Sequence, residues 1–232
     1  MKKIMFALTA LALQSAFAQT VRTFQSPSQW ECTYISTGNV CYIFGYGGVN
    51  PGATVTFPSS VYDAGVAKTY TVTQLGNGTD PVFTNQQGNV TQKITSITVP
   101  STVSQINSYA FSNLQFLTVA NTGSATIMPN ALPGSMQNLT AAGDLADSAC
   151  EGQPKLMSVT LQDGVRSIGS KAFKNCKRLT SLSIPKTVTY IAPDAFEGSG
   201  IKYVVLQRGN VSLKSFPKGI YATVQLLPYP KK

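Results

Sequence analysis

The 232-residue sequence contains no histidine, so the most common general base of enzyme active sites is missing. Serine and cysteine nucleophiles that depend on an imidazole are therefore excluded, as are metal sites built on histidine ligands. A serine–lysine pair remains formally open, but no motif marks one. The sequence also lacks the glycine-rich loops that bind dinucleotides or nucleoside triphosphates. The remaining candidates for chemistry are nine acidic residues and four cysteines.

One cluster of acidic residues stands out, formed by Asp144, Asp147 and Glu151. Two carboxylates across a cleft would suit glycoside hydrolysis, and oxygen ligands would suit calcium. The spacing matches no known calcium loop, so we predict a solvated turn. Asp194 and Glu197 flank an Ala-Phe pair and are also expected to be solvated. The sequence therefore predicts a protein that is not an enzyme and that holds no metal or cofactor.

Basic residues are concentrated in the last third of the chain. Residues 19–154 contain three basic and six acidic residues, whereas residues 155–232 contain thirteen basic and three acidic residues. The near-helical spacing from Lys171 to Arg178 predicts that these side chains point outward along one edge. The candidate binding residues are Lys171, Lys174, Lys177, Arg178, Lys186 and Lys202. Such a surface would attract acidic partners in a salt-dependent way, or it would simply be a solvated face that aids solubility.

A short apolar motif recurs along the chain and must position these residues. Its form is seen in Leu156-x-x-Val159-x-Leu161 and in Leu179-x-x-Leu182-x-Ile184. The first residues of seven such copies are at positions 94, 114, 136, 156, 179, 201 and 221, and an earlier copy is predicted at Val55-x-Phe57. Alternating apolar residues share one face of a strand. Each copy therefore predicts a short strand with one buried face.

A second motif, Val-x-x-Ile followed by Ala-Phe, recurs after these strands. It is clearest in Val103-x-x-Ile106 with Ala110-Phe111, and in Val165-x-x-Ile168 with Ala172-Phe173. A unit of roughly 21 residues cannot enclose a core, but stacked units can. We therefore predict a right-handed α/β solenoid with one parallel β-sheet and short helices or turns opposite. Residues 120–155, where Leu132 and Cys150 replace the phenylalanine, are expected to be less regular.

The repeat unit closely resembles that of the BspA-like leucine-rich-repeat proteins. The resemblance is carried by Val165-Arg166-Ser167-Ile168-Gly169, by the segment from Ala172-Phe173 through Cys176 to Leu179, and by Ser183-Ile184-Pro185. It covers about residues 53–227 and implies cell-surface attachment or recognition of proteins on a host or neighbouring cell. In this frame Cys176 takes the family's cysteine position and Cys150 a core phenylalanine position. Both are then buried small residues, with a bridge between adjacent units as the alternative.

The N-terminus resembles a secretory signal peptide over residues 1–18. Lys2 and Lys3 precede a short apolar run, and Ala16-Phe17-Ala18 fits a cleavage signal. The run is too short to span a bilayer, and no longer apolar segment follows. We therefore expect a secreted or cell-surface protein without a transmembrane segment.

Residues 19–52 are predicted to cap the open end of the solenoid, which occupies residues 53–232. Cys32 and Cys41 flank the turn signal Ser36-Thr37-Gly38-Asn39, which predicts a hairpin with the cysteines facing each other. Export would permit a disulfide between them. The aromatic residues of this segment favour a cap, and the alternative is a platform for stacking carbohydrate. They are Trp30, Tyr34, Tyr42, Phe44 and Tyr46.

Three functional hypotheses follow. The first is a non-catalytic binding module that recognises an extracellular protein or mediates adhesion. The alternative is a binder of acidic glycans or of an anionic cell envelope through the basic C-terminal surface. The third hypothesis is a hydrolase that uses Asp144, Asp147 or Glu151. We expect activity assays to detect no turnover, which would reject this hypothesis. Nucleic acid is disfavoured by export and by the lack of aromatic residues between the bases.

Overall fold

The structure is a computed structural model of the chain. It describes residues 21–28, 30–35, 38–46, 53–83, 94–207, 220 and 224–226. The predicted signal peptide at residues 1–18 lies outside these ranges. Among the described residues the only regular elements are strands, joined by turns and bends. The sequence pattern predicted short helices or turns opposite the sheet, and the described residues form turns there.

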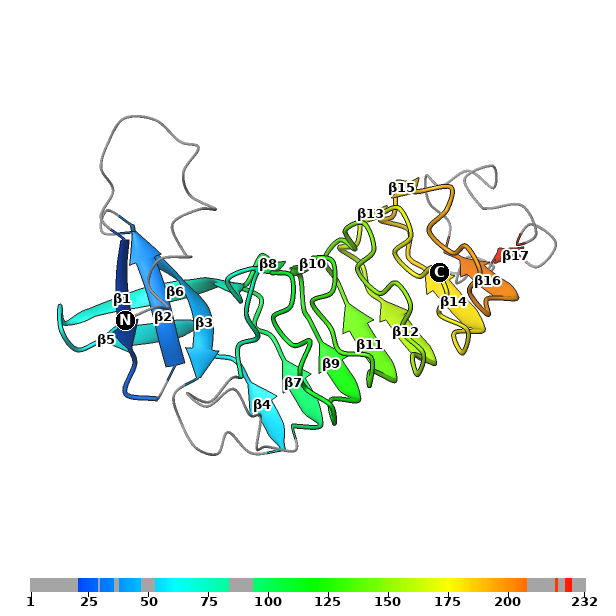
Figure 1. The fold of residues 1–232 in the computed structure, drawn as a ribbon. Coiled ribbons are helices and arrows are strands. Elements are labelled where there is room, and N and C mark those ends of the chain that lie inside the picture. The colour runs from blue at the N-terminus through cyan, green and yellow to red at the C-terminus, as the bar shows by residue number, and fades with distance from the viewer. Residues whose placement is uncertain are drawn as a thin grey trace.

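A parallel sheet of eight strands runs along one side of the molecule (Figure 1). In spatial order its strands are β17 (Val224–Leu226), β16 (Tyr203–Leu206), β14 (Ser181–Ile184), β12 (Ser158–Leu161), β11 (Asn138–Ala141), β9 (Val119–Asn121), β7 (Ser96–Thr98) and β4 (Thr54–Thr56). Each coil of the chain adds one strand, and the coils stack along a single axis. The predicted solenoid is confirmed, including the early copy at Val55.

The inward face of this sheet is a continuous apolar ladder. Ile97 pairs with Val55 on one side and Ala120 on the other, and Leu139 continues the row to Val159. All five residues are buried. A coil that buries only two or three such side chains is not stable alone, so each coil depends on its neighbours.

One copy of the strand motif was assigned three residues too early. The sequence pattern aligned Leu114 with Ile94 and predicted an inward Val119, but Ser96 pairs with Val119 and Ile97 pairs with Ala120. Val119 therefore points outward and is 41% exposed. Leu114 precedes Leu117 by three residues, as Cys176 precedes Leu179, and this Leu-x-x-Leu spacing imitates the start of a strand.

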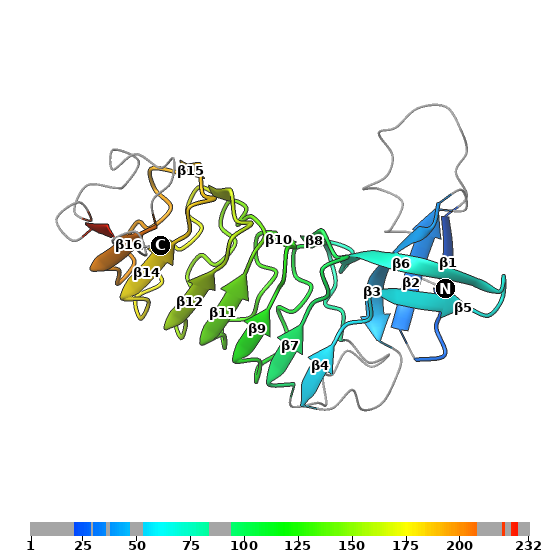
Figure 2. The same cartoon turned by 180° about the vertical axis from the view of Figure 1, so that it is seen from behind.

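Opposite the sheet, the coils are joined by a second, sparser parallel row (Figures 1 and 2). Its short strands are β8 (Gln105–Ile106), β10 (Thr126–Ile127), β13 (Ser167–Ile168) and β15 (Tyr190–Ile191). Between β10 and β13 the row continues as single bridges through Leu145. The isoleucines and Leu145 are the buried residues of the Val-x-x-Ile motif, as the repeat predicts.

The Ala-Phe pairs form a hydrogen-bond ladder between coils. The N–H of Phe111 donates to the carbonyl of Ala131, and the N–H of Phe173 donates to the carbonyl of Ala195, at 2.9 and 2.8 Å. The main-chain N–H of Cys150 donates to the carbonyl of Ala172 at 2.8 Å in the same way, so Cys150 occupies the phenylalanine position as predicted. The alanines are fully buried where coils meet, which leaves no room for a larger side chain.

Residues 120–155 are more regular than predicted. β11 pairs with β12 over all four of its residues and with β9 over three of them. Gly143 allows the close approach, because a Cβ there would collide with the carbonyl oxygens of Ser124 and Ala125. The irregular step lies instead between β12 and β14, where only Thr160 and Ser183 are paired.

The N-terminal strands form a mostly antiparallel sheet that covers one end of the stack (Figure 1). Its strands are β1 (Val21–Gln25), β2 (Trp30–Ile35), β3 (Val40–Tyr46), β5 (Ser60–Asp63) and β6 (Lys68–Leu75). β6 pairs in parallel with both β3 and β8, so this sheet continues into the sparse row of the solenoid. The boundary placed at residue 52 stays a prediction, since β5 and β6 follow it in sequence and join the strands before it.

Candidate interaction surfaces

The acidic cluster of residues 144–151 is tied to the neighbouring coil. Asp144 Oδ1 accepts hydrogen bonds from the main-chain N–H groups of Arg166 and Ser167, at 2.7 and 2.9 Å. Asp147 Oδ1 accepts from the N–H of Ser170 at 2.7 Å. These carboxylates satisfy donors that the sparse row leaves without strand partners. Asp147 is exposed and lies in a turn, as predicted, but both carboxylates also hold main-chain N–H groups of the next coil, which the prediction of a solvated turn did not include.

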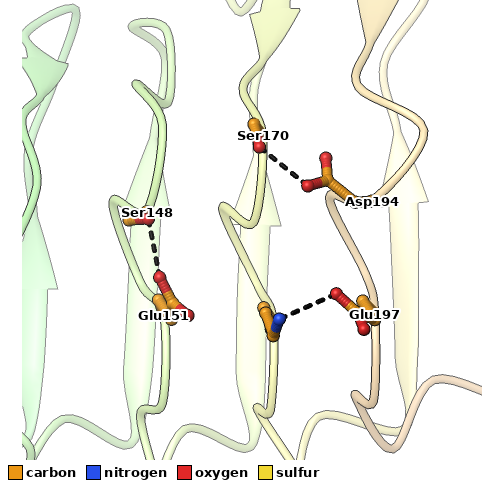
Figure 3. A network of polar contacts seen from close by, with 6 residues as sticks. Ser148, Glu151, Ser170, Asp194 and Glu197 are labelled. Atoms are coloured by element: carbon orange, nitrogen blue, oxygen red, sulfur yellow. Dashed lines mark hydrogen bonds and ion pairs between the residues drawn. The ribbon is translucent and has the colours of Figure 1, made fainter.

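Glu151 has a different partner within its own coil. Its Oε2 accepts a hydrogen bond from the Ser148 hydroxyl at 2.6 Å (Figure 3). The three acidic side chains are thus directed at three separate donors. The described residues also contain no group of three or more acidic or cysteine side chains placed to hold a metal ion.

Two further polar contacts join the next pair of coils (Figure 3). The Ser170 hydroxyl donates to Asp194 Oδ2 at 2.8 Å, and Lys174 Nζ lies 2.8 Å from Glu197 Oε2. The Ser170 hydrogen bond is the main reason that the pKa of Asp194 lies below its usual value. The hydrogen bond to Glu197 likewise raises the pKa of Lys174. Asp194 and Glu197 were predicted to be solvated helix residues; Glu197 is exposed and Asp194 half-buried, both lie in a turn, and both have partners.

The candidate basic residues fall into two groups. Lys174 and Lys186 are ion-paired, Lys186 with Asp163 at 3.5 Å. Lys171, Lys177, Arg178 and Lys202 are exposed. Arg178 precedes β14 and Lys186 follows it, so these two lie beyond opposite ends of that strand. A binding role for the six residues stays a prediction.

The outer face of the parallel sheet carries no charged residue over six strands. We call these twelve outward positions the sheet face; they are Thr54, Thr56, Ser96, Thr98, Val119, Asn121, Asn138, Thr140, Ser158, Thr160, Ser181 and Ser183. All are exposed or half-buried. They form two rows with neighbours about 4.8 Å apart, and every position in both rows is polar except Val119. Sequence reasoning missed this surface, although it is visible as Ser and Thr at the intervening positions of the strand motif.

Hydroxyl groups away from the sheet face are used to hold coils together. Thr118 Oγ1 donates to the carbonyl of Thr95 at 3.3 Å, and Thr187 Oγ1 donates to that of Val165 at 2.8 Å. Ser135 Oγ contacts two carbonyls of the preceding turn. Within the described part of the chain, the hydroxyls of the sheet face make no such bond. They are available to water or to a partner.

Of the aromatic residues predicted to form the cap, Tyr46 packs against the core and lies against Phe83, with ring centroids 6.0 Å apart. Tyr42 and Phe44 are half-buried and alternate along β3 with the buried Cys41 and Ile43. The contact of Tyr46 fits a cap, and the choice between a cap and a carbohydrate platform stays a prediction. The side chains of Trp30 and Tyr34 lie outside the described residues.

The predicted hairpin of Cys32 and Cys41 is formed by β2 and β3. Both cysteines are fully buried on the same face. They are not directly opposite, however, because Cys32 pairs with Ile43 and Cys41 with Tyr34. Their thiols share a hydrogen bond, which together with burial raises the pKa of Cys32. The pair is therefore diagonal, and its disulfide stays a prediction.

The other two cysteines are also buried, in adjacent coils. The Cys176 thiol donates to the main-chain carbonyl of Cys150 at 3.0 Å. Burial raises the pKa of Cys176 to about 11, and burial raises that of Cys150 as well. This arrangement favours buried thiols over a bridge between coils.

Comparisons with known proteins agree with this architecture. The sequence profile described as "BspA type Leucine rich repeat region" matches residues 88–137 and 144–227 in six copies. A comparison with curated proteins found no match. Within the described residues, no helix is long and apolar enough to cross a membrane.

Several solved structures are similar. The pneumococcal vaccine antigen PcpA is 18% identical, with a TM-score of 0.54, covering 82% of this chain and 51% of the other. A leucine-rich cell surface protein of Faecalibacterium prausnitzii is 20% identical, with a TM-score of 0.48, covering 84% and 56%. A leucine-rich-repeat protein of T. pallidum is 18% identical, with a TM-score of 0.45, covering 78% and 70%. The chain thus spans about half the length of the first two chains. With a repeat profile matching more than half of its residues and coils stacked as described, the chain belongs to the BspA-type leucine-rich-repeat family.

Proposed function

We propose that the chain is a non-catalytic binding module, secreted or held at the cell surface, that recognises a protein partner through its sheet face. The observation that carries this proposal is the uncharged sheet face, whose hydroxyls make no hydrogen bond within the described structure. Exposed polar groups on rigid strands lose little conformational entropy when a partner docks. The similar cell surface protein of Faecalibacterium prausnitzii supports the proposed location.

The arrangement of the acidic residues supports a non-catalytic role. Asp144 and Asp147 each hold main-chain N–H groups of the next coil, and Glu151 is bound to Ser148. A glycosidase needs two carboxylates that face a shared substrate position. These side chains face separate donors instead.

The test compares two variants with the same change in charge. Thr98→Glu/Thr140→Glu/Thr160→Glu places three charges on the sheet face. Gln115→Glu/Gln162→Glu/Gln207→Glu places three charges at exposed positions elsewhere. Both are probed on an array of purified extracellular proteins, with binding measured by biolayer interferometry. We expect the first variant to bind at least tenfold more weakly and the second to match the wild type; equal loss in both would contradict the proposal.

A second candidate is binding of acidic glycans by Lys171, Lys177, Arg178 and Lys202. All four are exposed, and within the described chain no ion pair with an acidic side chain involves them. Retention on heparin should then fall steeply with salt and be abolished by Lys171→Glu/Lys177→Glu/Arg178→Glu/Lys202→Glu. Retention on uncharged dextran serves as the control. Heparin retention that survives the substitutions would remove this candidate.

We also propose export through the signal peptide at residues 1–18, with residues 19–52 beginning the cap. The mature protein should then start at Gln19. Intact mass and N-terminal sequencing of protein recovered outside the cytoplasm test this directly. A mature chain that retains Met1 would contradict it.

A further inference from the structure

The N-terminal sheet contains a cysteine pair in a setting unlike any other in the described chain. Cys32 on β2 and Cys41 on β3 are fully buried, and their thiols contact each other across an antiparallel pair. A register shift lies directly at this point, between Glu31 and Cys32. From Cys32 to Tyr34 the pairing is regular, with Cys32 opposite Ile43 and Cys41 opposite Tyr34. The two cysteines are therefore diagonal neighbours on one face of the hairpin.

We propose that Cys32 and Cys41 form a structural disulfide in the exported protein, while Cys150 and Cys176 remain as two buried thiols. The bond would fasten β2 to β3. Because β3 pairs with β6 and β6 pairs with β8, it would anchor the sheet from which the sparse row of the solenoid begins. The proposal is independent of which surface binds a partner.

Other roles for this pair are less well supported. A metal site would need further ligands, and the described residues supply no group of three or more suitable side chains. A reactive thiol needs a lowered pKa and access to solvent. Here the hydrogen bond to Cys41, burial, and the nearby Asp63 and Glu31 all raise the pKa of Cys32.

The same burial determines when the bond must form. The thiolate of one cysteine attacks a disulfide-bearing oxidant, giving a mixed disulfide and releasing one oxidant sulfur as a thiolate. The second cysteine thiolate then displaces the other oxidant sulfur. The protein gains one S–S bond, the oxidant becomes a dithiol, and it takes up the two protons that the cysteines lose. Since the folded pair is buried, this exchange belongs to the unfolded or partly folded chain.

The second cysteine pair, Cys150 and Cys176, has a different hydrogen-bonding arrangement. The Cys176 thiol donates to the carbonyl oxygen of Cys150, so a bridge would have to give up that hydrogen bond in a packed core. Cys150 is 1% exposed and Cys176 is fully buried. Both positions also belong to the repeat, Cys150 where other coils have phenylalanine and Cys176 where another has Leu114. They act as core side chains.

The test uses the full chain, exported and purified without reductant. It is denatured and treated with iodoacetamide, and its intact mass is measured before and after reduction. Of the four cysteines, two should be alkylated before reduction and four after it. Chymotrypsin cleaves after Tyr34, which separates Cys32 from Cys41, so the bridged peptides can be identified directly. Four alkylated cysteines before reduction, none, or a bridge that includes Cys150 or Cys176 would each overturn the proposal.

A thermal measurement adds a second readout. Wild type that is reduced in denaturant and refolded with reductant should have a Tm about 5–10 °C below that of the untreated protein, as expected for a disulfide that closes a short loop in a domain of this size. The matched control Cys150→Ala/Cys176→Ala should keep that response, and Cys32→Ala/Cys41→Ala should lose it. If either variant fails to fold, the alkylation count of the wild type still decides the question. A wild-type Tm unchanged by this treatment would contradict a structural role for the bond.

Discussion

The two sides of each coil hold the stack together with different groups. On the sheet side, main-chain hydrogen bonds run through eight strands, and the outward side chains have no part in them. On the opposite side the strands are two residues long, and single bridges replace them at Leu145. There side chains complete the contacts, as when Asp144 binds the N–H groups of Arg166 and Ser167.

This difference shows which side chains are available for recognition. Several carboxylates on the turn side have a structural role, because they accept hydrogen bonds from the neighbouring coil. Within the described chain, the hydroxyls of the sheet face make no hydrogen bond of this kind. The uncharged face is therefore a better candidate for contact with a partner than the more conspicuous charged residues.

The largest expected effect comes from the apolar layer of the turn side. Phe173 is fully buried and stacks on Phe196 with centroids 5.8 Å apart. Phe173→Ala should lower the free energy of unfolding by about 3–5 kcal/mol, because it removes contacts in two coils and leaves a cavity. Urea denaturation measures the loss.

Leu182→Ala, on the sheet side, is the matched variant, with an expected cost of about 2–5 kcal/mol. Leu182 is also buried. A loss below about 1 kcal/mol for Phe173→Ala would mean that the turn side contributes little packing, and the comparison between the two sides would fail.

A smaller effect is expected at Asp144. Asp144→Ala removes the acceptor of two N–H groups and should cost about 1–3 kcal/mol. Thr160→Ala, on the sheet face, should change stability by no more than about 0.5 kcal/mol. Chemical denaturation of both variants tests the distinction; equal losses would show that sheet-face hydroxyls also hold the fold.

The repeat made most of the architecture predictable. Alternation within each strand motif predicted the inward ladder, and the Ala-Phe pairs predicted where the chain returns. The error at Leu114 arose because two leucines three residues apart fit both the end of a turn and the start of a strand. Only pairing with the neighbouring strand distinguishes the two, and that information is not local.

The roles of polar residues were harder to predict for the same reason. Asp144 and its partners are more than twenty residues apart, and their contact depends on the length of the intervening coil. The acidic cluster therefore looked like a solvated turn. The requirement for glycine at position 143 is also non-local, since it comes from carbonyls of the preceding coil.

The smallest expected effect is the pH dependence contributed by Asp194. Its pKa is lowered mainly by the Ser170 hydroxyl and more weakly by main-chain N–H groups and Lys171, against an opposing effect of burial. A carboxylate whose pKa is lower in the folded state stabilises the protein above its unfolded pKa, near 3.8, and this contribution is lost as pH falls through the folded value. Wild type should therefore have a higher Tm than Asp194→Asn at pH 6, and the gap should narrow below pH 3.8. Ser170→Ala, which removes the main cause, should show a weaker pH dependence than the wild type. A Tm difference between wild type and Asp194→Asn that stays constant down to about pH 2.5 would contradict this prediction. It would show that the charge of the Asp194 carboxylate does not stabilise the fold, and that its hydrogen bond to Ser170 is no stronger than one between neutral groups.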